Sequence, residues 1–160
     1  MHPQSLKYGL ISGALIAAIM FVAYLISKPL LVNFYLYAAV WCIPIFFMYT
    51  QCGEVTEESG FRSTFTRAFH IFLIASLMYQ ALYFGITYFD SEMVDVLKTA
   101  DIKRAEVFIP KDQLKDRLSE INRSDYAFNS RSAFLTLGLS IIKGGILSIG
   151  ITVIKRMRAV

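Results

Sequence analysis

A single lysine interrupts an otherwise uncharged apolar stretch of this sequence. Lys143 is the only charged residue between Ser132 and Ile154, and it lies eleven residues from either end of that stretch. At a helical rise of ~1.5 Å per residue, each end is ~16 Å away, which is farther than a lysine side chain extends. A lysine at the centre of a membrane helix costs on the order of 2.5–3.5 kcal/mol, so a polar partner or a cavity is expected beside it.

The polar groups available to Lys143 are uncharged. No Asp or Glu lies in any of the long apolar stretches, whereas Gln80 and Tyr79 lie at a similar depth in the third stretch, with Ser76 one turn away. A glutamine carbonyl accepts a hydrogen bond from an ammonium group but does not neutralise its charge. Lys143 is therefore expected near Gln80, either deprotonated or binding an anionic group. The alternative is a structural role, in which Lys143 joins helices or lines a small hydrated pocket.

Other residue types that could carry chemistry are sparse. His70 lies near the start of the third apolar stretch, where an imidazole can titrate or form an interfacial hydrogen bond. Cys42 and Cys52 lie ten residues apart, too far for a disulfide within one helix and without metal-ligand spacing. The sequence contains no metalloprotease, nucleophile-elbow, P-loop or dinucleotide motif, and no basic stripe for nucleic acid. We expect a protein that is not an enzyme and has no metal, no cofactor and no nucleic-acid partner.

Two stripes of small residues indicate close helix packing. One comprises Gly9, Gly13 and Ala17 near the amino terminus, and the other has strict four-residue spacing around Lys143. The second stripe consists of Thr136, Ser140, Gly144, Ser148 and Thr152. Small residues at this spacing let two membrane helices approach closely. The two stripes are expected to pack against each other, or against a second copy of the chain.

The elements that must position these residues are four long apolar stretches. Stretches without charge run over 8–27, 29–53 and 68–89, and a fourth runs over 132–154 with Lys143 inside it. About 20 residues suffice to cross the ~30 Å hydrocarbon core of a bilayer as a helix. Apolar residues occur on every side of these stretches, which argues against helices of a soluble core. The first stretch is too long for a cleaved signal peptide and has no cleavage site.

The sequence therefore predicts an all-α membrane protein, a four-transmembrane-helix bundle forming one domain over 1–160. The predicted helices span about 8–27, 30–51, 64–89 and 132–155. Lys28-Pro29 predicts a tight hairpin, Pro44 a kink, and Ser63 or Thr64 the N-cap of the third helix. The polar segment 90–131 is predicted to form two amphipathic helices that break near Pro110, the first continuing from the third membrane helix, folded over the end of the bundle.

Charge near the helix ends predicts the orientation. With the amino terminus in the cytoplasm, six basic residues lie inside and nine outside, but eight of those nine lie in the segment 90–131 beside nine acids. The tail Lys155 to Arg158 places three cations within four residues at a helix end. Giving that density the greater weight predicts that both termini are cytoplasmic.

The run from Gly60 to Phe69, Gly-Phe-Arg-Ser-Thr-Phe-Thr-Arg-Ala-Phe, enters the third apolar stretch. Together with the glycine-bearing first stretch, the short hairpin and the glycine-rich last stretch with its basic tail, it resembles the bacterial family named domain of unknown function 4199. The resemblance covers nearly the whole chain and implies four spans in the inner membrane of a Gram-negative bacterium. It transfers no functional residue, because that family has no established activity, and Lys143 departs from its apolar last helix.

These observations lead to two functional hypotheses. The first is a non-enzymatic structural or accessory subunit, which contacts the lipid bilayer and docks with itself or with another inner-membrane protein, such as an envelope-building enzyme suggested by the resemblance. The second is a small transporter or a lipid- or anion-binding membrane protein centred on Lys143.

Overall fold

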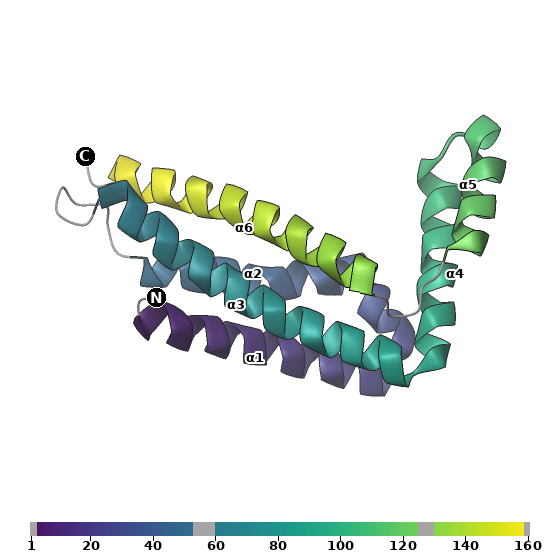
Figure 1. Cartoon of the computed structure of the whole chain (residues 1–160), viewed down its shortest axis with the longest axis horizontal. Coiled ribbons are helices and arrows are strands. Elements are labelled where there is room, and N and C mark those ends of the chain that lie inside the picture. Colours follow the sequence, from purple (N-terminus) through teal and green to yellow (C-terminus); the bar gives the residue numbers. More distant parts are fainter. Residues whose placement is uncertain (1–2, 53–59, 125–129, 159–160) are drawn as a thin grey trace.

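The computed structural model describes residues 3–52, 60–124 and 130–158, leaving aside the side chains of 130–132, and every element in these ranges is a helix (Figure 1). The elements are α1 (Pro3–Ile26), the 3₁₀ helix η1 (Lys28–Val32), α2 (Phe34–Gln51), α3 (Gly60–Phe89), α4 (Ser91–Phe108), α5 (Lys111–Arg123) and α6 (Ser130–Arg158). The prediction of an all-helical protein is confirmed.

Four of these helices are long and apolar enough to cross a membrane: Pro3–Ile26, Phe34–Gln51, Gly60–Phe89 and Ala133–Arg158. Large apolar side chains cover their outer surfaces, among them Val22, Phe46 and Ile146. An exposed apolar surface of this extent is favourable in lipid and unfavourable in water. The fold is therefore compatible with a membrane protein, as the sequence predicts.

The central helix is α3, which contacts α1, α2 and α6. Gly9 and Gly13 of α1 lie against Ile74 and Met78 of α3, so these two helices run in parallel. Gly144 of α6 lies against the Phe72 ring, also on α3. Because α3 lies between α1 and α6, these two helices do not contact each other within the described ranges (Figure 1). The expected packing of the two small-residue stripes against each other within one chain is thus wrong, since each packs on α3.

The predicted starts of the first three long helices are wrong, and the last helix spans Ser130–Arg158 instead of 132–155. The first begins at Pro3 instead of residue 8. The second long helix begins at Phe34 instead of residue 30, because the Asn33 side chain accepts hydrogen bonds from the backbone N–H groups of Tyr35 and Leu36 and caps α2. The third begins at Gly60, so Ser63 and Thr64 lie inside it and neither is an N-cap. The pair Ser59-Gly60 also predicts a turn before this helix, but Ser59 lies outside the described residues.

The polar segment forms the two predicted helices, and the break between them falls at Ile109 and Pro110. However, α4 does not continue α3. Asp90 ends α3 and caps α4 by accepting a hydrogen bond from the Glu92 N–H, and α4 then runs across the long helices (Figure 1). Among the described elements, α4 contacts η1, α3 and α5, whereas α5 contacts α4 alone. The polar segment therefore does not fold over the end of the long helices as a whole.

A cluster of charges joins the two connections at this end of the molecule. The Lys28 Nζ lies 2.7 Å from Asp90 Oδ2 and 2.6 Å from Glu92 Oε2, and the Tyr24 hydroxyl donates to Asp90 Oδ2 at 2.7 Å. The hydrogen bonds from Lys28 and Tyr24 lower the pKa of Asp90, and those to Asp90 and Glu92 raise the pKa of Lys28. The cluster holds the start of α4 against η1.

Replacement of Asp90 by Asn should lower the thermal unfolding temperature in detergent at neutral pH. Asparagine retains the helix cap but removes the charge that pairs with Lys28. Because the pKa of Asp90 is lower in the folded state, its contribution is present above the unfolded value of about 3.9 and is lost as the pH falls through the folded value. The difference between the native protein and the variant should therefore shrink on acidification below about pH 4. Glu92→Gln is the control and should have the smaller effect, since its side chain is 79% exposed.

Replacement of Gly144 by Ala should destabilise the contact between α3 and α6. The added Cβ would lie 2.7 Å from Phe72 Cδ1, and that ring is buried and stacked on Trp41. Overpacking of this kind costs about 1–3 kcal/mol of unfolding free energy. Gly145→Ala is the matched control, because its Cβ would meet no atom within 4 Å. Equal unfolding temperatures for the two variants would contradict the described packing of α6.

Candidate functional site

Lys143 lies on the wall of an open groove between α2 and α6. Its side chain is exposed, and the groove has a volume of about 380 Å³. The lining residues are Tyr37 and Trp41 from α2, Phe72 from α3, and Ser140, Lys143, Ile146 and Leu147 from α6. The floor and walls are thus largely apolar and aromatic, with one ammonium group at their edge.

The groove exists because α2 and α6 approach each other only toward one end. Near the chain termini, Met48 of α2, Ala68 of α3 and Ile151 of α6 form part of one buried core. At the same end, the Lys155 Nζ lies 4.3 Å from the centroid of the Tyr49 ring, and Arg158 hydrogen-bonds the Tyr49 hydroxyl. Nearer the middle of the helices, the space between Tyr37 and Lys143 is unfilled. The groove therefore opens sideways, toward the surroundings of the helices.

An aromatic group forms the α2 wall of the groove. The Trp41 ring stacks on Phe72 with centroids 5.1 Å apart and meets the Tyr37 and Tyr79 rings edge-on at 5.9 and 5.5 Å. The Trp41 Nε1 is buried and has no hydrogen-bond partner. Interlocked rings of this kind form a stiff surface, because each ring has few rotatable bonds and close neighbours on several sides.

Gln80 lies near Lys143 but pairs with other groups. Its Nε2 donates to Ser140 Oγ at 2.7 Å and to Ser76 Oγ at 3.1 Å, which links α3 to α6. The structure gives Lys143 neither a hydrogen bond nor an ion pair within the described residues. The predicted pairing of Lys143 with Gln80 is therefore absent. Instead, the hydroxyl of Ser140, one turn before Lys143, accepts a hydrogen bond from Gln80.

A second cavity of about 460 Å³ borders the first and shares Tyr37 with it. It extends toward α4 and includes Tyr79, Gln80, Tyr83, Thr136 and Arg104 among its lining residues. Arg104 Nη2 donates to the Val32 carbonyl oxygen at 3.0 Å, which fixes its head at the end of η1. Polar groups are thus more frequent near α4 than around Lys143.

The remaining predicted site residues lie elsewhere. His70 is on α3, ten residues before Gln80, and its Nδ1 is buried without a hydrogen-bond partner. Ala17 is half-buried on α1, while Gly9 and Gly13 are buried against α3. On α6, Gly144 and Ser148 are buried, and the Ser148 hydroxyl bonds to the Gly144 carbonyl. These residues pack helices together, and His70 is separate from the groove.

The four membrane-length helices contain no acidic residue that could serve as a counter-ion for Lys143. All twelve acidic residues lie in 54–58 or 90–125, outside the four membrane-length helices. The searched residues contain no group of three His, Cys, Asp or Glu side chains that could hold a metal, and Cys42 and Cys52 are free. The groove therefore offers one lysine without a counter-ion on an aromatic surface, a combination that suits recognition of an anion.

The aromatic residues of the groove, Tyr37, Trp41 and Phe72, were not predicted from the sequence. Each is one aromatic residue among many in its helix, and 14% of the chain is aromatic. Their role depends on which faces of α2 and α3 turn toward α6. An all-round apolar helix does not encode that information in its periodicity.

Comparisons with protein-family models, with curated proteins and with solved structures find no match for this chain. The relationship to domain of unknown function 4199 stays a prediction.

Disruption of the bond between Gln80 and Ser140 should lower stability by a modest amount. Gln80→Met keeps the side-chain volume and removes both donated hydrogen bonds, and Ser140→Ala removes one acceptor. Interhelical hydrogen bonds in membrane proteins contribute on average about 0.6 and at most about 1.7 kcal/mol. In a double-mutant cycle of unfolding free energies in detergent, the pair should show a coupling within this range. A coupling of zero would show that α3 and α6 are not joined by this bond.

Proposed function

We propose that this protein is a non-enzymatic membrane subunit that binds another integral membrane protein by seating one of the partner's transmembrane helices in the groove between α2 and α6. The observation that carries this proposal is an exposed and unpaired Lys143 at mid-span, beside an open aromatic groove. With the partner's helix in the groove, the four long helices and the partner's helix together form a complete bundle.

Electrostatics specify the partner's chemistry. A cation facing lipid at the middle of a bilayer is strongly unfavourable, so such residues pair with opposite charges or face the protein interior. A second copy of this chain has no carboxylate within its membrane-length helices, so it does not neutralise Lys143. The partner is therefore a different protein, with an Asp or Glu near the middle of the docked helix. Pairing lowers the cost of both intramembrane charges at once.

Depth favours a protein partner over a lipid headgroup. Lys143 is twelve residues from Lys155 at one end of α6 and thirteen from Ser130 at the other. At ~1.5 Å per residue, both distances are near 18 Å, whereas lipid phosphates lie at the membrane surface. A lipid could still enter the groove through its open side, and the alternative function, a lipid- or anion-binding protein or small transporter centred on Lys143, predicts that occupant.

The proposed location is the bacterial inner membrane, with both termini in the cytoplasm. The start of α1 and the end of α6 lie at the same end of the long helices (Figure 1), and the basic last turn of α6 lies there with Arg62 and Arg67 near the start of α3. Cations cluster on the cytoplasmic side of membrane proteins. The resemblance to domain of unknown function 4199 supports the inner membrane and suggests an envelope-building enzyme as the partner.

Photocrosslinking from the groove tests this function. A benzoylphenylalanine at Ile146, which lines the groove, should form an adduct with a second protein in native membranes. The same group at Ile149, which is exposed on α6 outside the groove, is the matched control and should not. Lys143→Met should abolish the adduct and Lys143→Arg should retain it, because arginine keeps the positive charge and also pairs with a carboxylate. Lys143→Met should also unfold at the same or a higher temperature, since Lys143 has no partner to lose among the residues that the structure describes.

The adduct must also have the predicted chemistry. The captured protein should contain a transmembrane Asp or Glu, and its replacement by Asn or Gln should abolish crosslinking from Ile146. Adducts formed only with lipid would favour the lipid-binding alternative. An adduct formed only with a second copy of this chain, or one that survives Lys143→Met, would contradict the proposed partner.

A further inference from the structure

The far end of α4 presents two large apolar side chains to the surroundings. Val107 and Phe108 are 74% and 81% exposed. Phe108 lies on the same stripe as Leu97 and Arg104, from which it is separated by eleven and four residues, and Val107, three residues after Arg104, lies at the edge of this stripe. Near the start of α4 this stripe faces the long helices, since Met93 is fully buried in their core and Leu97 packs against it. The stripe therefore continues beyond the surface that covers it.

The direction of α4 determines what the uncovered part faces. In Figure 1, α4 runs across the axes of the long helices, and its later part extends beyond α6. A helix in this orientation lies parallel to the plane of a bilayer that the long helices cross. Along the first part of α4, the stripe faces the long helices. Along the later part, where no long helix lies beneath α4, the same stripe faces the lipid surface. α5 packs beside α4, with Ala105 and Ile121 buried.

The depth of α4 matches the boundary of the membrane. Its first part contacts η1, which joins the end of α1 to the start of α2 and so lies at the ends of two spans. Exposed aromatic side chains surround this level, including Tyr35 at the start of α2 and Tyr88 at the end of α3. Exposed tyrosine side chains are enriched at membrane–water interfaces.

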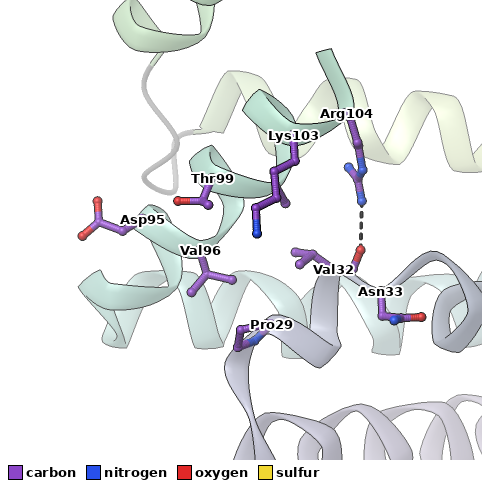
Figure 2. A pocket seen from close by; sticks show the side chains of 9 residues that line it. Pro29, Val32, Asn33, Asp95, Val96, Thr99, Lys103 and Arg104 are labelled. Atoms are coloured by element: carbon purple, nitrogen blue, oxygen red, sulfur yellow. Dashed lines mark hydrogen bonds between the residues drawn. The ribbon is translucent and has the colours of Figure 1, made fainter. Parts of the chain in front are cut away.

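A cavity of about 450 Å³ between η1 and α4 adds a cation at the same level (Figure 2). Lys103 extends into the space above Pro29 and Val32, and Arg104 donates to the Val32 carbonyl oxygen (Figure 2). Within the described ranges, Lys103 forms no ion pair. An ammonium group beside an apolar floor at the membrane surface suits the phosphate of a lipid headgroup, with the acyl chains below it.

We infer that the hairpin of α4 and α5 is a membrane-surface anchor, in which Val107 and Phe108 enter the lipid and Lys103 binds headgroup phosphates. Amphipathic helices bind the interface by this combination of apolar burial and electrostatic attraction to anionic lipid. In this arrangement, the lipid surface contacts the later part of α4 on the face that no other described element covers. This inference is independent of the groove at Lys143, because it depends on different residues and a different occupant.

Spin-label depth measurements on the full chain in nanodiscs test the anchor. In a Cys42→Ser, Cys52→Ser background, a nitroxide is attached at position 108 or, as the matched control, at position 106. Glu106 is exposed on the opposite side of the same helix, so neither label disturbs a buried contact. The label at 108 should be relaxed by oxygen and protected from a water-soluble nickel complex, and the label at 106 should show the reverse.

Two results would overturn the anchor. If both labels are equally accessible to the nickel complex, the hairpin stands in water, and if both are protected, α4 is buried in lipid or in another protein. Lys103→Gln, with the label at 108, should shift that label toward water in nanodiscs that contain phosphatidylglycerol. An unchanged depth would remove Lys103 from the anchor.

Discussion

A cation without a counter-ion inside a membrane-length helix is the constraint on which the interpretation of this protein depends. Lys143 is near the middle of α6, and the four long helices contain no carboxylate. The nearby amide of Gln80 is bonded to Ser140 and Ser76, and no other group among the described residues pairs with Lys143. Any occupant that compensates Lys143 in lipid must therefore come from outside the chain.

The packing of the long helices gives that occupant a place. Glycines on α1 and α6 both direct their close contacts to α3, which becomes the central helix, and α2 joins α6 only toward the ends that carry the basic tail. Four helices arranged in this way leave one side of α3 uncovered between α2 and α6. The wall around Trp41 is stiff because its rings pack against one another, and the Phe72 ring also lies against Gly144 of α6.

Much of the fold follows from composition, and less of the site does. Four membrane-length helices and the break near Pro110 were predicted correctly, because uncharged length and proline act locally. The start of α2 was predicted incorrectly, because the side chain of Asn33 caps a new helix within a stretch of apolar residues. The prediction also paired the two small-residue stripes and joined Gln80 to Lys143. Both errors concern which face of an apolar helix meets which neighbour, and all-round apolar sequences carry little information about that choice.

Charge exchange between Lys143 and its partner tests the central claim most directly. Lys143→Asp alone should abolish the complex, as should replacement of the partner's intramembrane carboxylate by Lys. When both changes are combined, the attraction is restored with its polarity reversed, and the complex should form again in native membranes. Failure of the combined variants to associate, while each folded protein still reaches the membrane, would contradict an ion pair in the groove.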